Sequence, residues 1–257
     1  MTQSLRVEQD GRLLHLTLNR AEKRNALNEE LCYGIVGTIE HAQQDRHVGA
    51  VLLDAEGPVF CAGMDLDEAA ADDAPVRTAI HEKLFSMWHW SRKPIIAAVG
   101  GPALGGGVGL VANAHITIAA QGVTFGLTEI RLGLWPLLIY RAMVAAIGER
   151  RALELSLTGR IFDLNQAVQW GLVHEVAPAF ELEDRAMAVA HAVANASAEA
   201  VARGMEFAHS VREIDLEAAL KLALQIRSEL FKSADFREGV AAFREKRAPN
   251  WPSHRVS

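Results

Sequence analysis

Short apolar stretches separated by segments of helical periodicity constrain the fold of this chain more than any other feature. The segments VGAVLLDA (48–55), PIIAAV (94–99) and HITIAA (115–120) are apolar almost throughout instead of alternating between apolar and polar residues. Strands of this kind are buried on both faces, as in sheets that helices cover. The pattern therefore predicts an α/β fold with helices on at least one face of the sheet.

The remaining elements follow from periodicity and turn signals. Two strands are expected within residues 4–20, around a turn at Asp10-Gly11, and a short strand at 172–177. The sequence predicts helices at residues 27–45 with Asn28 as N-cap, about 76–90, 140–159, 165–171, 183–197, 198–210 and 216–233. The charged segment FREGVAAFREKRAPNW near the C-terminus is either solvated or closes over a site or a neighbouring subunit.

Composition excludes several classes of protein. The chain has 257 residues, half of them hydrophobic, which is enough for a substantial core. Its net charge is −6 and its 26 basic residues are scattered, so no nucleic-acid partner is expected. It has no secretory leader pattern and no run of about 18 apolar residues, so a cytoplasmic protein without a membrane partner is expected. Cys32 and Cys61 match neither a disulfide framework nor zinc-ligand spacing, so no metal is expected.

A dense glycine cluster follows the apolar stretch at 94–99. Gly105, Gly106 and Gly107 are consecutive, and Gly109 follows closely. The cluster does not fit the dinucleotide fingerprint, because Leu110 stands where the third glycine should be. A phosphate-binding loop ending in Gly-Lys-Ser/Thr and a Gly-x-Ser-x-Gly nucleophile elbow are also absent.

A helix beginning near Gly106 would expose amide groups that have no partner within the helix. Such an end attracts negative charge, and it can stabilise the oxyanion that forms when a thioester is converted to its enolate. Close packing of the helix against the sheet explains glycines equally well. The cluster alone leaves these two interpretations open.

Five stretches together resemble the crotonase superfamily, the enoyl-CoA hydratase/isomerase family. They have the order and spacing of the family and are LNRAEKRNALN (18–28), GPVFCAGMDLDE (57–68), KPIIAAVGGPALGGGVGL (93–110), FGLTEIRLGLWP (125–136) and LTGRIFDLNQAVQWGLVHEV (157–176). The resemblance extends over essentially the whole chain. It implies a crotonase-like spiral of ββα units with a C-terminal helical region.

The resemblance also implies an organisation and a place in metabolism. Residues 1–195 would form the acyl-CoA-binding core, and residues 196–257 a helical region for trimerisation or a lid. The expected assembly is a homotrimer or a dimer of trimers. The expected context is fatty acid metabolism, with no separate cofactor because coenzyme A is part of the thioester substrate.

Site residues are carried over from the family motifs. The backbone amides of Met64 and Gly106 would form the oxyanion hole. Coenzyme A would lie along KRNAL and the segment after Cys61. Its expected contacts are Lys23, Arg24, Ala26, Leu27, Ala62, Asp65 and Leu66. Trp135 either lines the acyl pocket or packs in the core, and the acyl chain preference depends on loops around Ala70 to Arg77 and around Trp135.

The expected chemistry depends on carboxylates. Hydratases of the family use two glutamates, and this chain has Glu129 in the FG-x-x-E stretch but Gly109 at the other position. One carboxylate is sufficient to take a proton from C2 and return it at C4, so isomerisation of a 3-enoyl-CoA to a 2-enoyl-CoA is predicted. The alternatives are hydration or other enolate chemistry on a CoA thioester, and a non-catalytic acyl-CoA-binding scaffold.

Overall fold

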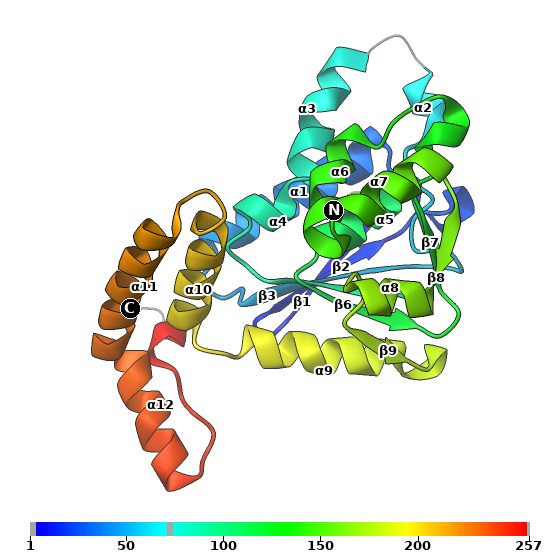
Figure 1. Ribbon diagram of the computed structural model, residues 1–257. Coiled ribbons are helices and arrows are strands. Elements are labelled where there is room, and N and C mark those ends of the chain that lie inside the picture. The colour runs from blue at the N-terminus through cyan, green and yellow to red at the C-terminus, as the bar shows by residue number, and fades with distance from the viewer. Residues whose placement is uncertain (1–3, 71–73, 256–257) are drawn as a thin grey trace.

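The computed structural model describes residues 4–70 and 74–255, and its chain path is drawn in Figure 1. It is an α/β fold with two sheets, surrounding helices and a helical C-terminal region, as expected from the sequence. The strands are β1 (Leu5–Asp10), β2 (Leu13–Leu18), β3 (Ala50–Ala55), β4 (Ile95–Val99), β5 (Ala103–Leu104), β6 (Ile116–Ala120), β7 (Thr124–Gly126), β8 (Ile161–Asp163) and β9 (Glu175–Ala177).

Helices form most of the remaining chain. They are α1 (Glu29–Gln44), α2 (Leu66–Ala69), α3 (Ala74–Leu84), α4 (Met87–Trp90), α5 (Gly106–Asn113), α6 (Leu137–Ile147), α7 (Glu149–Thr158), α8 (Leu164–Trp170), α9 (Leu182–Ala194), α10 (Ala198–Ser210), α11 (Leu216–Lys232) and α12 (Ala234–Glu245). No helix in the described part of the chain is long and apolar enough to cross a membrane.

The larger sheet has the strand order β1-β2-β3-β4-β6-β9. Only the β1–β2 hairpin is antiparallel, and the other neighbours are parallel. Every residue of β4 is buried, which explains why this strand is apolar throughout. Helix α9 packs across β3, β4 and β6 and covers one face (Figure 1).

The predicted helix start at Asn28 is confirmed. The side-chain oxygen of Asn28 accepts a hydrogen bond from the Leu31 amide at 3.1 Å, which satisfies one of the free donors of the first turn of α1. Leu31, Ile35 and Ile39 recur at helical spacing and are buried in the core.

A smaller sheet with the order β5-β7-β8 was not predicted. Its strands have two or three residues each, too few to show an apolar periodicity. It matters for function because Leu104 pairs with Gly126, so the glycine cluster after β5 lies beside the segment that leads to Glu129.

Two predicted helices are each divided in the structure. The helix expected at 76–90 is two, α3 and α4, and the Trp88 amide donates to Asn113 Oδ1 at 3.1 Å where the helix is interrupted. The helix expected at 140–159 is α6 and α7, because Gly148 between them has φ of 83°. Their periodicity continues across each break, so the pattern alone did not reveal them.

Helices α10, α11 and α12 extend away from the sheets (Figure 1). The buried carboxylate of Asp235 joins the start of α12 to the start of α10 and to the segment after α12, since it accepts hydrogen bonds from the Ser197 hydroxyl and from the amide and hydroxyl of Ser253. The boundary expected at 195/196 falls between α9 and α10. The expected trimer stays a prediction.

Candidate active site

Two loops bring the backbones of Met64 and Gly106 to one place. The amide of Leu27 donates to the Gly63 carbonyl at 2.8 Å, and the Asp65 amide donates to the Leu27 carbonyl at 3.1 Å. A Cβ atom at Gly63 would lie 3.3 Å from the Gly106 nitrogen, so the two chain segments are in close contact. Neither the Met64 nor the Gly106 amide donates to another group within the described residues.

Gly105 connects the small sheet to α5 in a conformation that suits glycine. Its φ is 52° and its ψ is −120°. Its amide donates to the Gly126 carbonyl at 2.8 Å. A Cβ atom here would lie 3.2 Å from Glu129 Oε1, so the carboxylate packs directly against the glycine backbone.

Glu129 begins a short 3-10 helix, Glu129–Leu132, after β7. Its Oε2 atom is buried and has no hydrogen-bond partner in the described part of the chain. Burial raises the pKa of the Glu129 carboxyl above its ordinary value, and its own backbone amide opposes this in part. The group is thus a partly desolvated carboxyl that is available for proton transfer.

These groups face one apolar pocket with a volume of about 400 Å³. Five predicted site residues line it: Leu27, Met64, Gly106, Glu129 and Trp135. Leu134 and Leu138, close to Trp135 in the chain, line it too. The structure adds His81, Phe85, Pro136, Leu137 and Ile139. Pro136, Leu137 and Ile139 follow Trp135 directly in the chain, whereas His81 and Phe85 reach the pocket by long-range packing that no sequence signal revealed.

The space beside Gly109 is occupied. A Cβ atom at Gly109 would lie 2.4 Å from Ile139 Cγ2 and 2.9 Å from Phe85 Cδ1. Any side chain at position 109 would therefore displace Phe85 or Ile139. The position that carries a second glutamate in hydratases is closed by packing in this chain.

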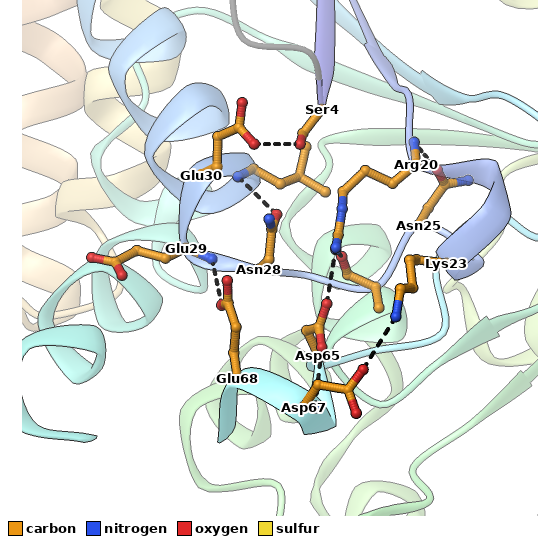
Figure 2. A network of polar contacts seen from close by, with 12 residues as sticks. Ser4, Arg20, Lys23, Asn25, Asn28, Glu29, Glu30, Asp65, Asp67 and Glu68 are labelled. Carbon is orange, nitrogen blue, oxygen red and sulfur yellow. Dashed lines mark hydrogen bonds and ion pairs between the residues drawn. The ribbon is translucent and has the colours of Figure 1, made fainter. Parts of the chain in front are cut away.

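The residues expected to contact coenzyme A lie on two adjacent loops, shown in part in Figure 2. The Ala62 amide donates to the Arg24 carbonyl at 3.0 Å, which joins the loops. Lys23 and Arg24 are exposed, and Lys23 pairs with Asp67 at 3.2 Å. Apart from Leu27, the predicted coenzyme A residues do not line the apolar pocket; they are Lys23, Arg24, Ala26, Ala62, Asp65 and Leu66.

Asp65 has a structural partner. Its carboxylate accepts from Arg20 Nη2 at 3.0 Å and from the Asp67 amide at 3.2 Å (Figure 2). Burial acts to raise the pKa of Asp65, but the hydrogen bonds from Arg20 and backbone amides hold it below its ordinary value. The side chain thus fixes the loop and caps α2. The backbone amide and carbonyl of Asp65 are also bonded, to the Leu27 carbonyl and the Ala69 amide.

Asn25 lies within KRNAL but was not among the predicted coenzyme A contacts. Its side chain is fully buried and donates to the carbonyls of Glu56 and Val59 at 2.9 and 2.8 Å. Its Oδ1 accepts from the Arg20 amide at 2.8 Å. These bonds hold a turn in which Arg24 and Asn25 both have positive φ, which asparagine tolerates better than most residues.

Several other predictions can be placed. Of the loop Ala70 to Arg77, residues 71–73 lie outside the described residues, and the side chains at 71–78 are not described. His115 lies at the far end of α5 from Gly106, where its Nδ1 accepts from the Ile95 amide at 2.9 Å. No cluster of metal-ligating side chains occurs in the described part of the chain.

Comparisons with known proteins give the same assignment as the fold and the site. The family described as enoyl-CoA hydratase/isomerase matches residues 8–254. A probable enoyl-CoA hydratase of Mycobacterium tuberculosis is 35% identical, with 98% of this chain and 99% of the relative covered. The 2,3-dehydroadipyl-CoA hydratase of Escherichia coli is 32% identical, with 95% and 97% covered.

Solved structures of enoyl-CoA hydratases have the same fold as this chain. An enoyl-CoA hydratase of Mycobacterium smegmatis superposes with a TM-score of 0.91 at 30% identity, covering 96% of this chain and 98% of that one. One from Bacillus anthracis has a TM-score of 0.91 at 30% identity, covering 98% and 100%. The chain belongs to the enoyl-CoA hydratase/isomerase family, and it has the crotonase fold.

Proposed function

We propose that this protein is an acyl-CoA isomerase that converts a 3-enoyl-CoA thioester to the 2-enoyl-CoA thioester. The observation that carries the proposal is the pairing of one buried carboxyl, Glu129, with a filled space at Gly109. The amides of Met64 and Gly106 have no partner in the described structure and face the same pocket, so they are placed to bind the thioester oxygen.

The reaction then needs a single base. Glu129 removes a proton from C2, and the electron pair moves into the thioester to give a dienolate whose oxygen the two amides stabilise. The same carboxyl returns the proton at C4, while the double bond moves from C3–C4 to C2–C3. No water is added, and Glu129 regains its charge at the end.

Hydration is the second candidate, because the curated relatives named above are called hydratases. It requires a positioned water and a group that deprotonates it. In this pocket Phe85 and Ile139 occupy the space beside Gly109, which favours isomerisation.

One experiment separates the two reactions. The protein is incubated with a 3-enoyl-CoA and, separately, with a 2-enoyl-CoA, each at several chain lengths. Isomerisation predicts conversion of the first without a change in mass. Gain of one water by the second at a comparable rate would favour hydration. Tight acyl-CoA binding without conversion of either substrate at any chain length would indicate a binding scaffold.

Coenzyme A recognition and assembly are part of the proposal. The exposed cations Lys23 and Arg24 and the backbone around Ala62, Asp65 and Leu66 would bind the nucleotide portion. Helix α11 leaves Leu216, Leu220 and Leu224 exposed at helical spacing, which supports the predicted trimer because such apolar surfaces commonly pack against another chain.

A further inference from the structure

A second cavity lies at the end of α5 opposite Gly106. Its volume is about 280 Å³, and its lining comes from α4, α5, α6 and α10 together with residues next to β6 and β9. In Figure 1, α10 lies beside α4, so the cavity is at the junction between the core and the C-terminal helices. It shares no lining residue with the candidate active site.

The titratable groups in this cavity are all basic. His115, His174, His209 and Arg212 line it, and no aspartate or glutamate occurs among its described lining residues. The whole chain carries a net charge of −6. A cavity that is lined by basic side chains and by no acidic ones therefore differs from the rest of this acidic chain. Such a cavity attracts anions.

His115 contributes a donor that has no acceptor. Its Nδ1 accepts from the Ile95 amide at 2.9 Å, so the proton of the neutral ring is on Nε2. Nε2 is buried and makes no hydrogen bond with any described residue. A buried donor without a partner is unfavourable and calls for a bound water or ion.

His209 is on α10, and Arg212 is on the turn that follows it. The Arg212 guanidinium lies 4.2 Å from the ring centre of Trp88, which leaves the N–H groups at its edge free to bind. It forms no ion pair with an acid among the described residues, and the neighbouring Glu213 is directed to Arg141. The His209 ring lies 6.4 Å from that of His115.

The protonation states agree with this geometry. Burial, followed by the charges of His209 and Arg212, lowers the pKa of His115 to about 4, so its neutral N–H form dominates at pH 7. Burial, followed by the charges of His89 and Arg212, also lowers the pKa of His209. The Trp88 carbonyl opposes both shifts but does not form a hydrogen bond with His115 Nε2.

We propose that this cavity binds a small oxyanion, a phosphate or carboxylate group, with His115 Nε2–H, the His209 ring and the Arg212 guanidinium as donors. Arg212 supplies the charge and His115 the buried directional donor. Because the donors come from both the core and the end of α10, the bound anion joins the C-terminal helices to the core.

The test uses the full chain and titrates it with inorganic phosphate and, separately, with acetate at constant ionic strength. Histidine ring resonances and Tm are followed. We expect a saturable shift of the His115 ring signals and a Tm that rises with ligand concentration. Arg212→Gln should weaken binding by about tenfold, because it removes a charge-assisted hydrogen bond.

Arg203→Gln is the matched control, since it removes the same charge from α10, the helix that precedes Arg212, at a position outside the cavity. Its binding should change by less than about twofold. Response to only one of the two anions identifies the group that the cavity accepts. No saturable response to either, or equal weakening by the two variants, would overturn the proposal and leave these histidines as ordinary residues at helix ends.

Discussion

The two ends of helix α5 each have a buried titratable group nearby, and burial acts on them in opposite directions. At the Gly106 end, burial raises the pKa of Glu129. At the Asn113 end, burial lowers the pKa of His115 to about 4. In both places the neutral form is favoured, because a low-dielectric environment penalises charge of either sign.

Glu129 and His115 have different neighbours, and they are therefore suited to different chemistry. Glu129 lies in an apolar pocket beside two unpartnered backbone amides, so its proton is the one that can move. His115 lies among other basic groups, and its Nε2 makes no hydrogen bond with a described residue, so it is suited to hold an anion. Burial alone therefore does not identify a catalytic group.

The largest effect is expected from Glu129→Gln, at the Gly106 end of α5. It should reduce isomerase turnover by about 10²–10⁴, because it removes a positioned acid–base group and keeps the shape of the side chain. Steady-state rates with 3-enoyl-CoA measure this. Glu217→Gln on exposed α11 is the control and should retain full activity. An active Glu129→Gln enzyme would remove Glu129 from the mechanism.

The next effect concerns the closed space beside Gly109. Gly109→Glu should lower the free energy of unfolding by about 1–3 kcal/mol or more, because the new side chain must displace Ile139 and Phe85. Denaturant unfolding measures the change. The ratio of hydration to isomerisation should rise only when Ile139→Ala is added to make room. A single variant as stable as the parent would contradict the packing account.

The pH dependence of stability should show opposite signs at the two ends. Ionisation of Glu129 costs stability as pH rises from 4.5, its ordinary pKa, through its raised value in the fold. Protonation of His115 costs stability as pH falls from 6.5 towards about 4. His115→Gln should therefore reduce the acid-side loss by about 1–2 kcal/mol.

Unfolding curves at pH 4.5 and pH 7 provide the measurement, with His47→Gln at an exposed position as the control. Glu129→Gln should increase the net loss of stability from pH 7 to pH 4.5, because it removes the Glu129 contribution that opposes that of His115. If the parent and His115→Gln lost the same free energy of unfolding between pH 7 and pH 4.5, this ring would not ionise in that range.

The smallest effect is expected at the coenzyme A loop. Lys23→Ala should raise KM for acyl-CoA by only about two- to fivefold with kcat unchanged, because exposed ion pairs contribute roughly 0.2–1 kcal/mol. Arg150→Ala on α7, also exposed, is the control. A fall in kcat would mean that Lys23 affects the reacting groups.

Much of the fold could be predicted, because the residue pattern of a long helix or strand lies within that element. The apolar runs of β3, β4 and β6 and the Asn28 cap of α1 were identified correctly. The small sheet could not be predicted, since its strands are too short to show a period. At the start of α4, after the division from α3, the Trp88 amide donates to Asn113, 25 residues away, a contact that no local pattern reveals.

The candidate site was predictable to a similar extent. Motif resemblance placed Met64, Gly106 and Glu129, and the structure brings all three to one pocket. The closure of the Gly109 position by Phe85 and Ile139 depends on tertiary packing and has no local signature. The cavity at His115 brings residues just before β6 together with side chains from α10. The sequence pattern therefore could not predict it.

The central claim is that one buried carboxyl performs both proton transfers, and isotope transfer tests it most directly. A 3-enoyl-CoA labelled with deuterium at C2 is converted in ordinary water under single-turnover conditions, and the product is analysed by mass and NMR. The account predicts a 2-enoyl-CoA that carries deuterium at C4, because Glu129 moves the label within the apolar pocket. A product without deuterium at C4, or one that has gained a water, would contradict it.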